Sequence, residues 1–173
     1  MFTRRILFFL SVFLSVCQYG TAQEADFCDA VMAILRDAPN QFRNVHVGLR
    51  SSDASSSIFK SNIKVPGTIN SRFVSSMGLF YEGALYQSSD KLAMEMAYGK
   101  YRAQLNDCLK PQGYNMSITN NFNVDTGDFK KAIFIQPFKE DMDIKKMPGH
   151  VTMEVDHNKE TNVYTLIFYI FEH

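Results

Sequence analysis

Histidine and acidic side chains recur along one segment near the C-terminal end of this chain, and their types suit metal binding. Successive side chains of a strand point to opposite faces, so a strand here would place His150, Glu154 and Asp156 on one face, with His157 next in sequence. At ~3.3 Å per residue, His150 and Asp156 lie roughly 20 Å apart and do not share one ion. We therefore interpret the pattern as the solvent-facing side of a strand and expect no metal or other cofactor.

A second polar pattern, Asn121-x-Asn123-x-Asp125-x-Gly127, is similar to a calcium-binding loop. Its glycine comes one residue late, and Ala132 stands where such a loop carries its bidentate glutamate. The same residue types are favoured in hairpin turns. We interpret the segment as a turn.

Motifs for nucleophilic catalysis and for phosphate binding are absent from the sequence. No G-x-S-x-G elbow occurs, and the nine glycines are scattered. Eighteen basic residues balance eighteen acidic ones, which argues against nucleic acid as a partner. These features favour a protein that is not an enzyme. The alternative is a hydrolase that uses carboxylates or His150 in a cleft formed by the fold.

The last predicted strand, Val163–Phe171, is apolar on both faces. One face, with Tyr164, Leu166, Phe168 and Ile170, suits packing beneath helices. The other face carries Thr165, Ile167, Tyr169 and Phe171. On a two-layer domain this second face meets water, so either residues 139–149 cover it, the sheet curls around it, or it is an interaction surface. The strand register decides whether Ile58, Phe80, Tyr86 and Phe134 extend this surface.

Two segments repeat apolar residues at helical spacing. The first is about Phe27–Ala38, with Asp26 placed to cap it, and the second runs from Ser89 or Asp90 to about Leu109. The predicted buried positions are Phe27, Val31, Ile34, Leu35 and Ala38 in the first helix, and Met94, Tyr98, Tyr101, Leu105 and Cys108 in the second.

The remaining regular segments are predicted to be strands. They are Ser57–Val65, Leu79–Gln87, Asn115–Phe122, Lys131–Phe138, His150–Asp156 and Val163–Phe171, with hairpin turns at 125–128 and 157–160. This order, α-β-β-α-β-β-β-β, predicts an α+β domain in which two antiparallel helices pack on one face of a mostly antiparallel sheet.

The N-terminus resembles an export signal. Arg4 and Arg5 precede an apolar run from Ile6 to Val16, and small residues lead to a cleavage point after Ala22. The run is shorter than the ~20 residues of a membrane-spanning helix. We therefore predict that residues 1–22 are a cleaved signal peptide, that 23–173 form a single α+β domain without a stable membrane anchor, and that the protein is secreted or periplasmic.

Export gives the cysteines a structural meaning. Cys17 leaves with the signal peptide, so Cys28 and Cys108 remain and are predicted to form one disulfide. Closing a loop of about 80 residues stabilises the fold by roughly 4 kcal/mol through loop-closure entropy. Asn115-Met116-Ser117 is in addition a glycosylation sequon, which matters only in a eukaryotic host.

Together these features predict a small exported binding or interaction module that acts through the Thr165, Ile167, Tyr169 and Phe171 face. Its partner is a protein or a small ligand that the sequence does not identify. Two other hypotheses stay open, namely the hydrolase and a self-associating structural component that forms a homodimer.

Overall fold

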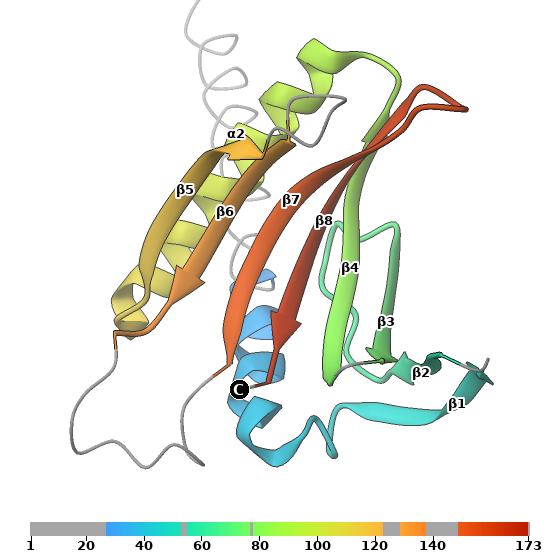
Figure 1. The fold of residues 1–173 in the computed structure, drawn as a ribbon. Helices are drawn as coiled ribbons and strands as arrows, with labels where there is room; N and C mark the ends of the chain where they lie inside the picture. Colours follow the sequence, from blue (N-terminus) through green and yellow to red (C-terminus); the bar gives the residue numbers. More distant parts are fainter. Residues whose placement is uncertain (1–26, 53–54, 77, 123–128, 138–148, 173) are drawn as a thin grey trace, which may run out of the picture.

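The computed structural model describes residues 27–52, 55–76, 78–122, 129–137 and 149–172 of the 173-residue chain (Figure 1). A helix covers residues 27–37 of this part. It is followed by the short 3-10 helix η1 (Ala38–Asn40) and the strands β1 (His46–Ser52), β2 (Ser57–Ser61), β3 (Asn70–Ser75) and β4 (Leu79–Ser88). The helix α2 (Lys91–Leu109) and the 3-10 helix η2 (Lys110–Gln112) come next, and the strands β5 (Asn115–Phe122), β6 (Phe129–Ile135), β7 (His150–Asn158) and β8 (Val163–Phe171) complete the described elements.

The eight strands form one antiparallel sheet in the order β1-β2-β3-β4-β8-β7-β6-β5. Each half of the chain is thus a helix followed by a four-stranded meander. The last strands of the two halves, β4 and β8, pair at the centre of the sheet. The prediction of an α+β domain with an antiparallel sheet is confirmed.

Capping residues set the ends of α2, and the apolar residues of both helices form their buried faces. The Asp90 side chain caps α2 by accepting hydrogen bonds from the backbone nitrogens of Leu92 and Ala93, at 2.8 and 3.3 Å. After α2, Pro111 lies within η2, and Gly113 takes a left-handed conformation with φ of +85°. All ten predicted helix positions are buried or packed against the core.

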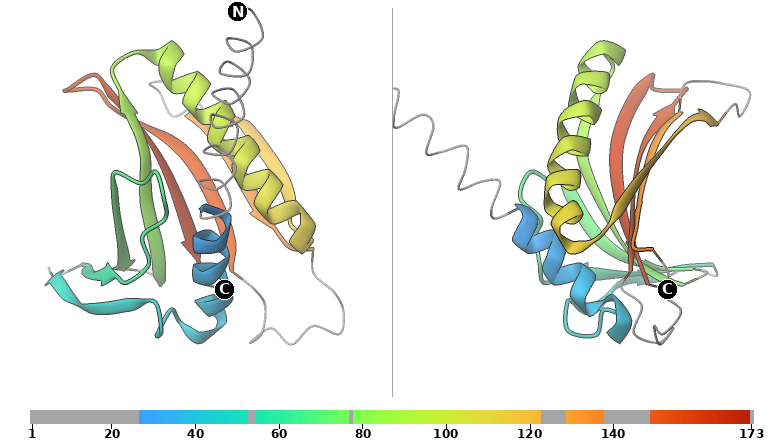
Figure 2. Two further views of the ribbon diagram at one scale, coloured as in Figure 1. Left: turned by 180° about the vertical axis from the view of Figure 1, so that it is seen from behind. Right: turned by 90° about the vertical axis from the view of Figure 1, so that its left-hand side faces the viewer.

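Figure 2 shows both helices on the same side of the sheet, which bends so that the helices lie on its convex side. The two helices run in the same general direction and are offset along the sheet (Figures 1 and 2), so the expected antiparallel arrangement is wrong. A disulfide can join the start of one helix to the end of another whether the helices lie antiparallel side by side or follow one another in the same direction. The Cys28–Cys108 bridge alone therefore did not determine the helix directions. The ring of Phe27 contacts Tyr101 of α2 and Phe168 of β8, with centroids 6.3 and 6.4 Å apart.

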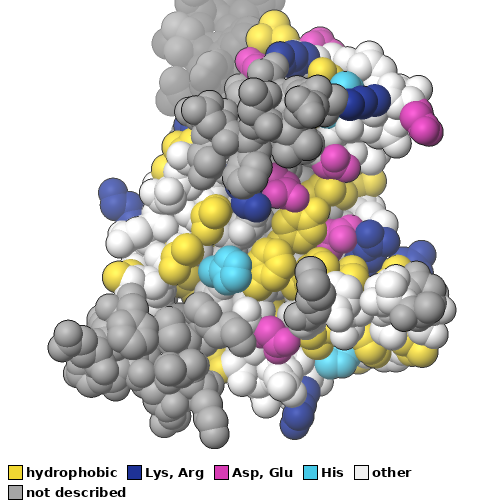
Figure 3. Space-filling model, in the orientation of Figure 1, with side chains coloured by type: hydrophobic (Ala, Val, Ile, Leu, Met, Phe, Trp, Pro, Cys, Tyr) yellow, Lys and Arg dark blue, Asp and Glu magenta, His cyan; other side chains and the backbone are white. Residues whose placement is uncertain are grey.

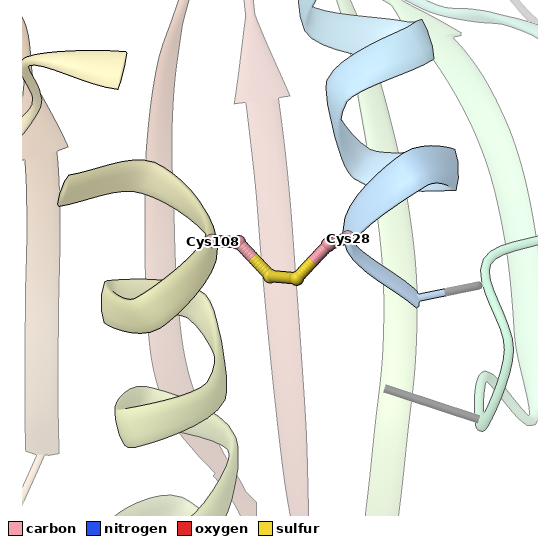
Figure 4. The surroundings of a disulfide bond; sticks show 2 residues. All are labelled: Cys28 and Cys108. Atoms are coloured by element: carbon pink, nitrogen blue, oxygen red, sulfur yellow. A yellow bond between two sulfur atoms is a disulfide. The ribbon is translucent and has the colours of Figure 1, made fainter. Parts of the chain in front are cut away.

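Cys28 and Cys108 form the predicted disulfide, with Cα atoms 5.3 Å apart and a sequence separation of 80. Figure 4 shows the bridge between the first helix and the end of α2. It therefore connects the helices of the two halves directly.

Two strands, β1 and β3, were missed by the sequence analysis, so the element order is α-β-β-β-β-α-β-β-β-β. In β1, six of the seven residues are exposed, and the register shifts on either side of Leu49, so no alternation of apolar and polar residues marks the strand. In β3, Phe73 alone is fully buried. The β7–β8 turn also lies at 159–162, two residues later than predicted.

The core lies between the helices and the sheet, and at its centre a glycine makes room for an aromatic ring. Gly83 of β4 pairs with Phe168 of β8. A Cβ atom at position 83 would lie 2.5 Å from Cε1 of Phe168 and 3.1 Å from Cε1 of Tyr81.

Within the described residues, no helix has the length and the apolar character that a membrane span requires.

Candidate binding surface on the open face of the sheet

The two faces of β8 differ as the alternation of its residues predicts. Leu166, Phe168 and Ile170 are completely buried on the helix side. The four residues of the predicted surface lie on the opposite side, which the helices leave open, and all four are half-buried: Thr165, Ile167, Tyr169 and Phe171. The register places each of them beside a residue of β4 and one of β7, so the surface is built from the three central strands.

Four rings of the open face pack against one another. Phe80 contacts both Tyr169 and Phe171, with ring centroids 5.9 and 5.3 Å apart, and Tyr169 lies 5.8 Å from Phe171. The His150 ring stacks on Phe171 at 4.7 Å with 13° between the planes. We call Phe80, His150, Tyr169 and Phe171 the aromatic cluster. All four are half-buried, so each ring keeps part of its surface accessible.

Apolar side chains extend the aromatic cluster toward β1. Ile58 pairs with Val74, Val74 with Phe80, and Phe80 with Phe171, so this row crosses β2, β3, β4 and β8 before it reaches His150 on β7. Directly paired residues of adjacent strands share a face. The register, which the sequence left open, places Ile58 and Phe80 on this face, and Val74 joins them from a strand that was not predicted.

Tyr86 and Phe134, the other two residues considered for this surface, lie on the helix side. A register shift between Ala84 and Tyr86 places Tyr86 opposite the buried Leu166. Phe134 pairs with the buried Val151 and is itself buried.

Two ion pairs flank the aromatic cluster. Arg72 of β3 pairs with Glu82 of β4 at 2.7 Å, and Lys131 of β6 pairs with Glu154 of β7 at 3.3 Å. Glu82 is the direct neighbour of Tyr169 in the β4–β8 ladder. In Figure 3, which views this open face, hydrophobic side chains form patches beside acidic, basic and histidine side chains.

The Tyr169 hydroxyl lies in an acidic environment. Burial, together with the nearby carboxylates of Glu154, Glu82 and Asp156, raises the pKa of Tyr169 far above its usual value. The residue therefore stays a neutral phenol, with a hydroxyl able to donate a hydrogen bond to a carboxylate or to a bound partner.

Three of the four β7 residues that were considered and rejected as metal ligands make other contacts. His150 stacks on Phe171, and Glu154 is paired with Lys131. His157 stacks on Tyr164 near the β7–β8 turn, with centroids 4.1 Å apart. In the described part of the chain, no group of three or more His, Cys, Asp or Glu residues is placed to hold a metal ion.

Two other expectations fall on residues outside the described part. Most of the calcium-like loop lies at 123–128, and residues 138–148 make up most of the segment that was considered as a cover for the open face. Gly149, which ends this segment, is buried, and its carbonyl accepts a hydrogen bond from the Tyr114 hydroxyl at 3.0 Å.

No protein-family model, no curated protein and no solved structure matches this chain.

Proposed function

We propose that this protein is an exported, non-catalytic binding module that holds a protein partner on the open face of its sheet. The observation that carries this proposal is the aromatic cluster, in which four half-buried rings from three central strands lie on the face that the helices leave uncovered. Aromatic side chains surrounded by ion pairs are the usual composition of the centre and rim of a protein interface.

The extent of the surface supports a polypeptide as the partner. The row from Ile58 to His150 crosses five adjacent strands, a width of about 19 Å at ~4.8 Å per strand. A surface of this width on a bent sheet suits a protein chain better than a compact small molecule.

The hydrolase hypothesis has less support. Glu82 and Glu154, two carboxylates beside the aromatic cluster, each form an ion pair with a basic side chain. A general acid and a general base need carboxylates that contact the substrate, and these two contact Arg72 and Lys131 instead.

Export is the second part of the proposal. It rests on the signal-like N-terminal sequence and is supported by the Cys28–Cys108 disulfide, because such bonds persist in oxidising compartments.

Site-specific photo-crosslinking tests the open face. A benzophenone-bearing phenylalanine analogue replaces Tyr169 in one variant and Leu92 in the other, and both variants are produced in the native host. Leu92 is a suitable control because it is an exposed apolar residue of α2, on the helix side of the sheet. We expect an adduct of defined mass from position 169 and none from position 92. Unlabelled wild-type protein should compete with this adduct, and the Ile167→Asp variant should not.

Light scattering during size-exclusion chromatography distinguishes binding of another protein from self-association of this chain. A wild-type dimer that Tyr169→Asp and Ile167→Asp convert to a folded monomer would favour the self-associating component. If both variants unfold while Leu92→Asp remains folded, the open face belongs to the core and the proposal is wrong.

A further inference from the structure

Exposed apolar side chains lie on β5 and β6, the two strands at one edge of the sheet. The edge strand β5 pairs with β6 alone in the described part of the chain. Met116 and Ile118 of β5 are 36% and 40% exposed, and Ile135 of β6 is 45% exposed. An edge strand with exposed apolar side chains tends to pair with another chain unless something obstructs it.

The first residue of β5 is the asparagine of the sequon Asn115-Met116-Ser117. All three of its residues are exposed. Asn115 pairs directly with Ile135, so their side chains lie on the same face of the sheet, with Cβ atoms about 5 Å apart.

We propose that Asn115 is a site of N-linked glycosylation and that the attached glycan obstructs the β5 edge. The proposal rests on export, here through a eukaryotic secretory route. In the transfer, the Asn115 side-chain nitrogen attacks the anomeric carbon of an oligosaccharide carried on a polyprenyl diphosphate. The bond from that carbon to the diphosphate oxygen breaks, the nitrogen loses one proton, and polyprenyl diphosphate leaves.

The position suits a large polar group because the exposed Asn115 side chain can carry a glycan without any change in the core. A hydrated glycan at the start of β5 would stand beside Ile135 and hinder a second chain from pairing with the free backbone groups of the edge strand. The β5 backbone that carries Asn115 lies two strands, or roughly 10 Å, from β7, where the aromatic cluster begins with His150.

Secretion of the full chain, with its own N-terminal segment, from a eukaryotic cell line tests the modification. Treatment with peptide N-glycosidase should lower the mass of the secreted wild-type protein and convert Asn115 to Asp in the corresponding peptide. Asn115→Gln and Ser117→Ala should abolish this mass change, whereas Ser117→Thr should preserve it. Secreted wild-type protein that carries the Cys28–Cys108 disulfide and an unmodified Asn115 would overturn the proposal. Failure of secretion would count against the export on which it rests, because a protein that stays inside is not presented to the transferase.

The role of the glycan is tested by the mass of the secreted protein in solution. We expect glycosylated wild type to remain monomeric at concentrations at which Asn115→Gln self-associates, and we expect Met116→Lys to restore a monomer in the Asn115→Gln background. The Tyr169→Asp change in the same background should not restore it, since that residue lies in the aromatic cluster. An Asn115→Gln protein that stays monomeric throughout would show that the glycan does not protect the edge.

Discussion

The His150 ring lies flat against Phe171, with centroids 4.7 Å apart and planes 13° from parallel, so this histidine forms part of the aromatic cluster. His157, at the other end of β7, makes a closer stack with Tyr164, at 4.1 Å and 11°. Two histidines of one strand thus make the same contact on opposite faces of the sheet.

The two stacked histidines should contribute similarly to stability but differently to binding of the partner. We expect His150→Ala and His157→Ala to lower the free energy of unfolding by similar amounts, roughly 0.5–1.5 kcal/mol for the loss of one aromatic pair. Only His150→Ala should weaken the cross-link formed from position 169, because His157 lies outside the aromatic cluster. Urea denaturation and the yield of the cross-linked adduct measure the two effects. Equal losses of adduct in both variants would argue against the cluster as the contact surface.

A methyl group at position 83 should be costly. Its Cβ would lie 2.5 Å from the Phe168 ring, so we expect Gly83→Ala to destabilise the fold by roughly 1–3 kcal/mol. Gly99→Ala is the matched control, because nothing lies within 4 Å of a Cβ there and alanine favours the helix by about 0.5–1 kcal/mol. Thermal unfolding should therefore shift in opposite directions for the two variants. A neutral Gly83→Ala would show that β4 and β8 adjust without strain.

The disulfide should account for a large share of the stability. We expect Cys28→Ser/Cys108→Ser to lower the free energy of unfolding by about 4 kcal/mol, because the bridge closes a loop with a sequence separation of 80. Wild-type protein in reducing buffer serves as the control and should match the double variant in urea denaturation. A loss below about 1 kcal/mol would mean that packing alone holds the two helices in place.

Buried tyrosines should make the fold sensitive to alkali. Burial raises the pKa of Tyr81 and of Tyr114 to about 12 from the usual 10.0. The folded chain then retains protons that the unfolded chain releases. Stability should therefore be complete below pH about 10 and fall as the pH rises from about 10 to about 12.

Urea midpoints measured from pH 9 to pH 12 check this dependence. The double variant Tyr81→Phe/Tyr114→Phe should show a shallower decline than wild type. At neutral pH it should be less stable, by about 1 kcal/mol for the Tyr114 hydrogen bond to Gly149 alone. An unchanged decline would show that other groups cause the loss at high pH.

Local pattern alone predicted several parts of this structure correctly. The helical spacing of residues such as Val31 and Tyr98 identified both helices and their buried faces, because a helix needs only its own residues to define a face. The even number of cysteines in the predicted mature chain identified the Cys28–Cys108 bridge. Alternation along β8 separated Phe168, which is buried, from Tyr169 on the open face, since strand geometry fixes which residues share a side.

Which residues lie on the open face of the sheet was decided by the tertiary structure. The register shift between Ala84 and Tyr86 turns Tyr86 toward the helices, although simple alternation places it with Phe80. Val74 joins the surface only because Phe73, on the other face of the same strand, is held in the core by residues distant in sequence. The direction of the helices likewise depended on how the two halves pack, because one disulfide constrains the distance between two points and leaves the orientation free. A chain determines from its own spacing which residues share a face, but register, bulges and helix orientation come from the balance of all the strand pairs and core contacts together.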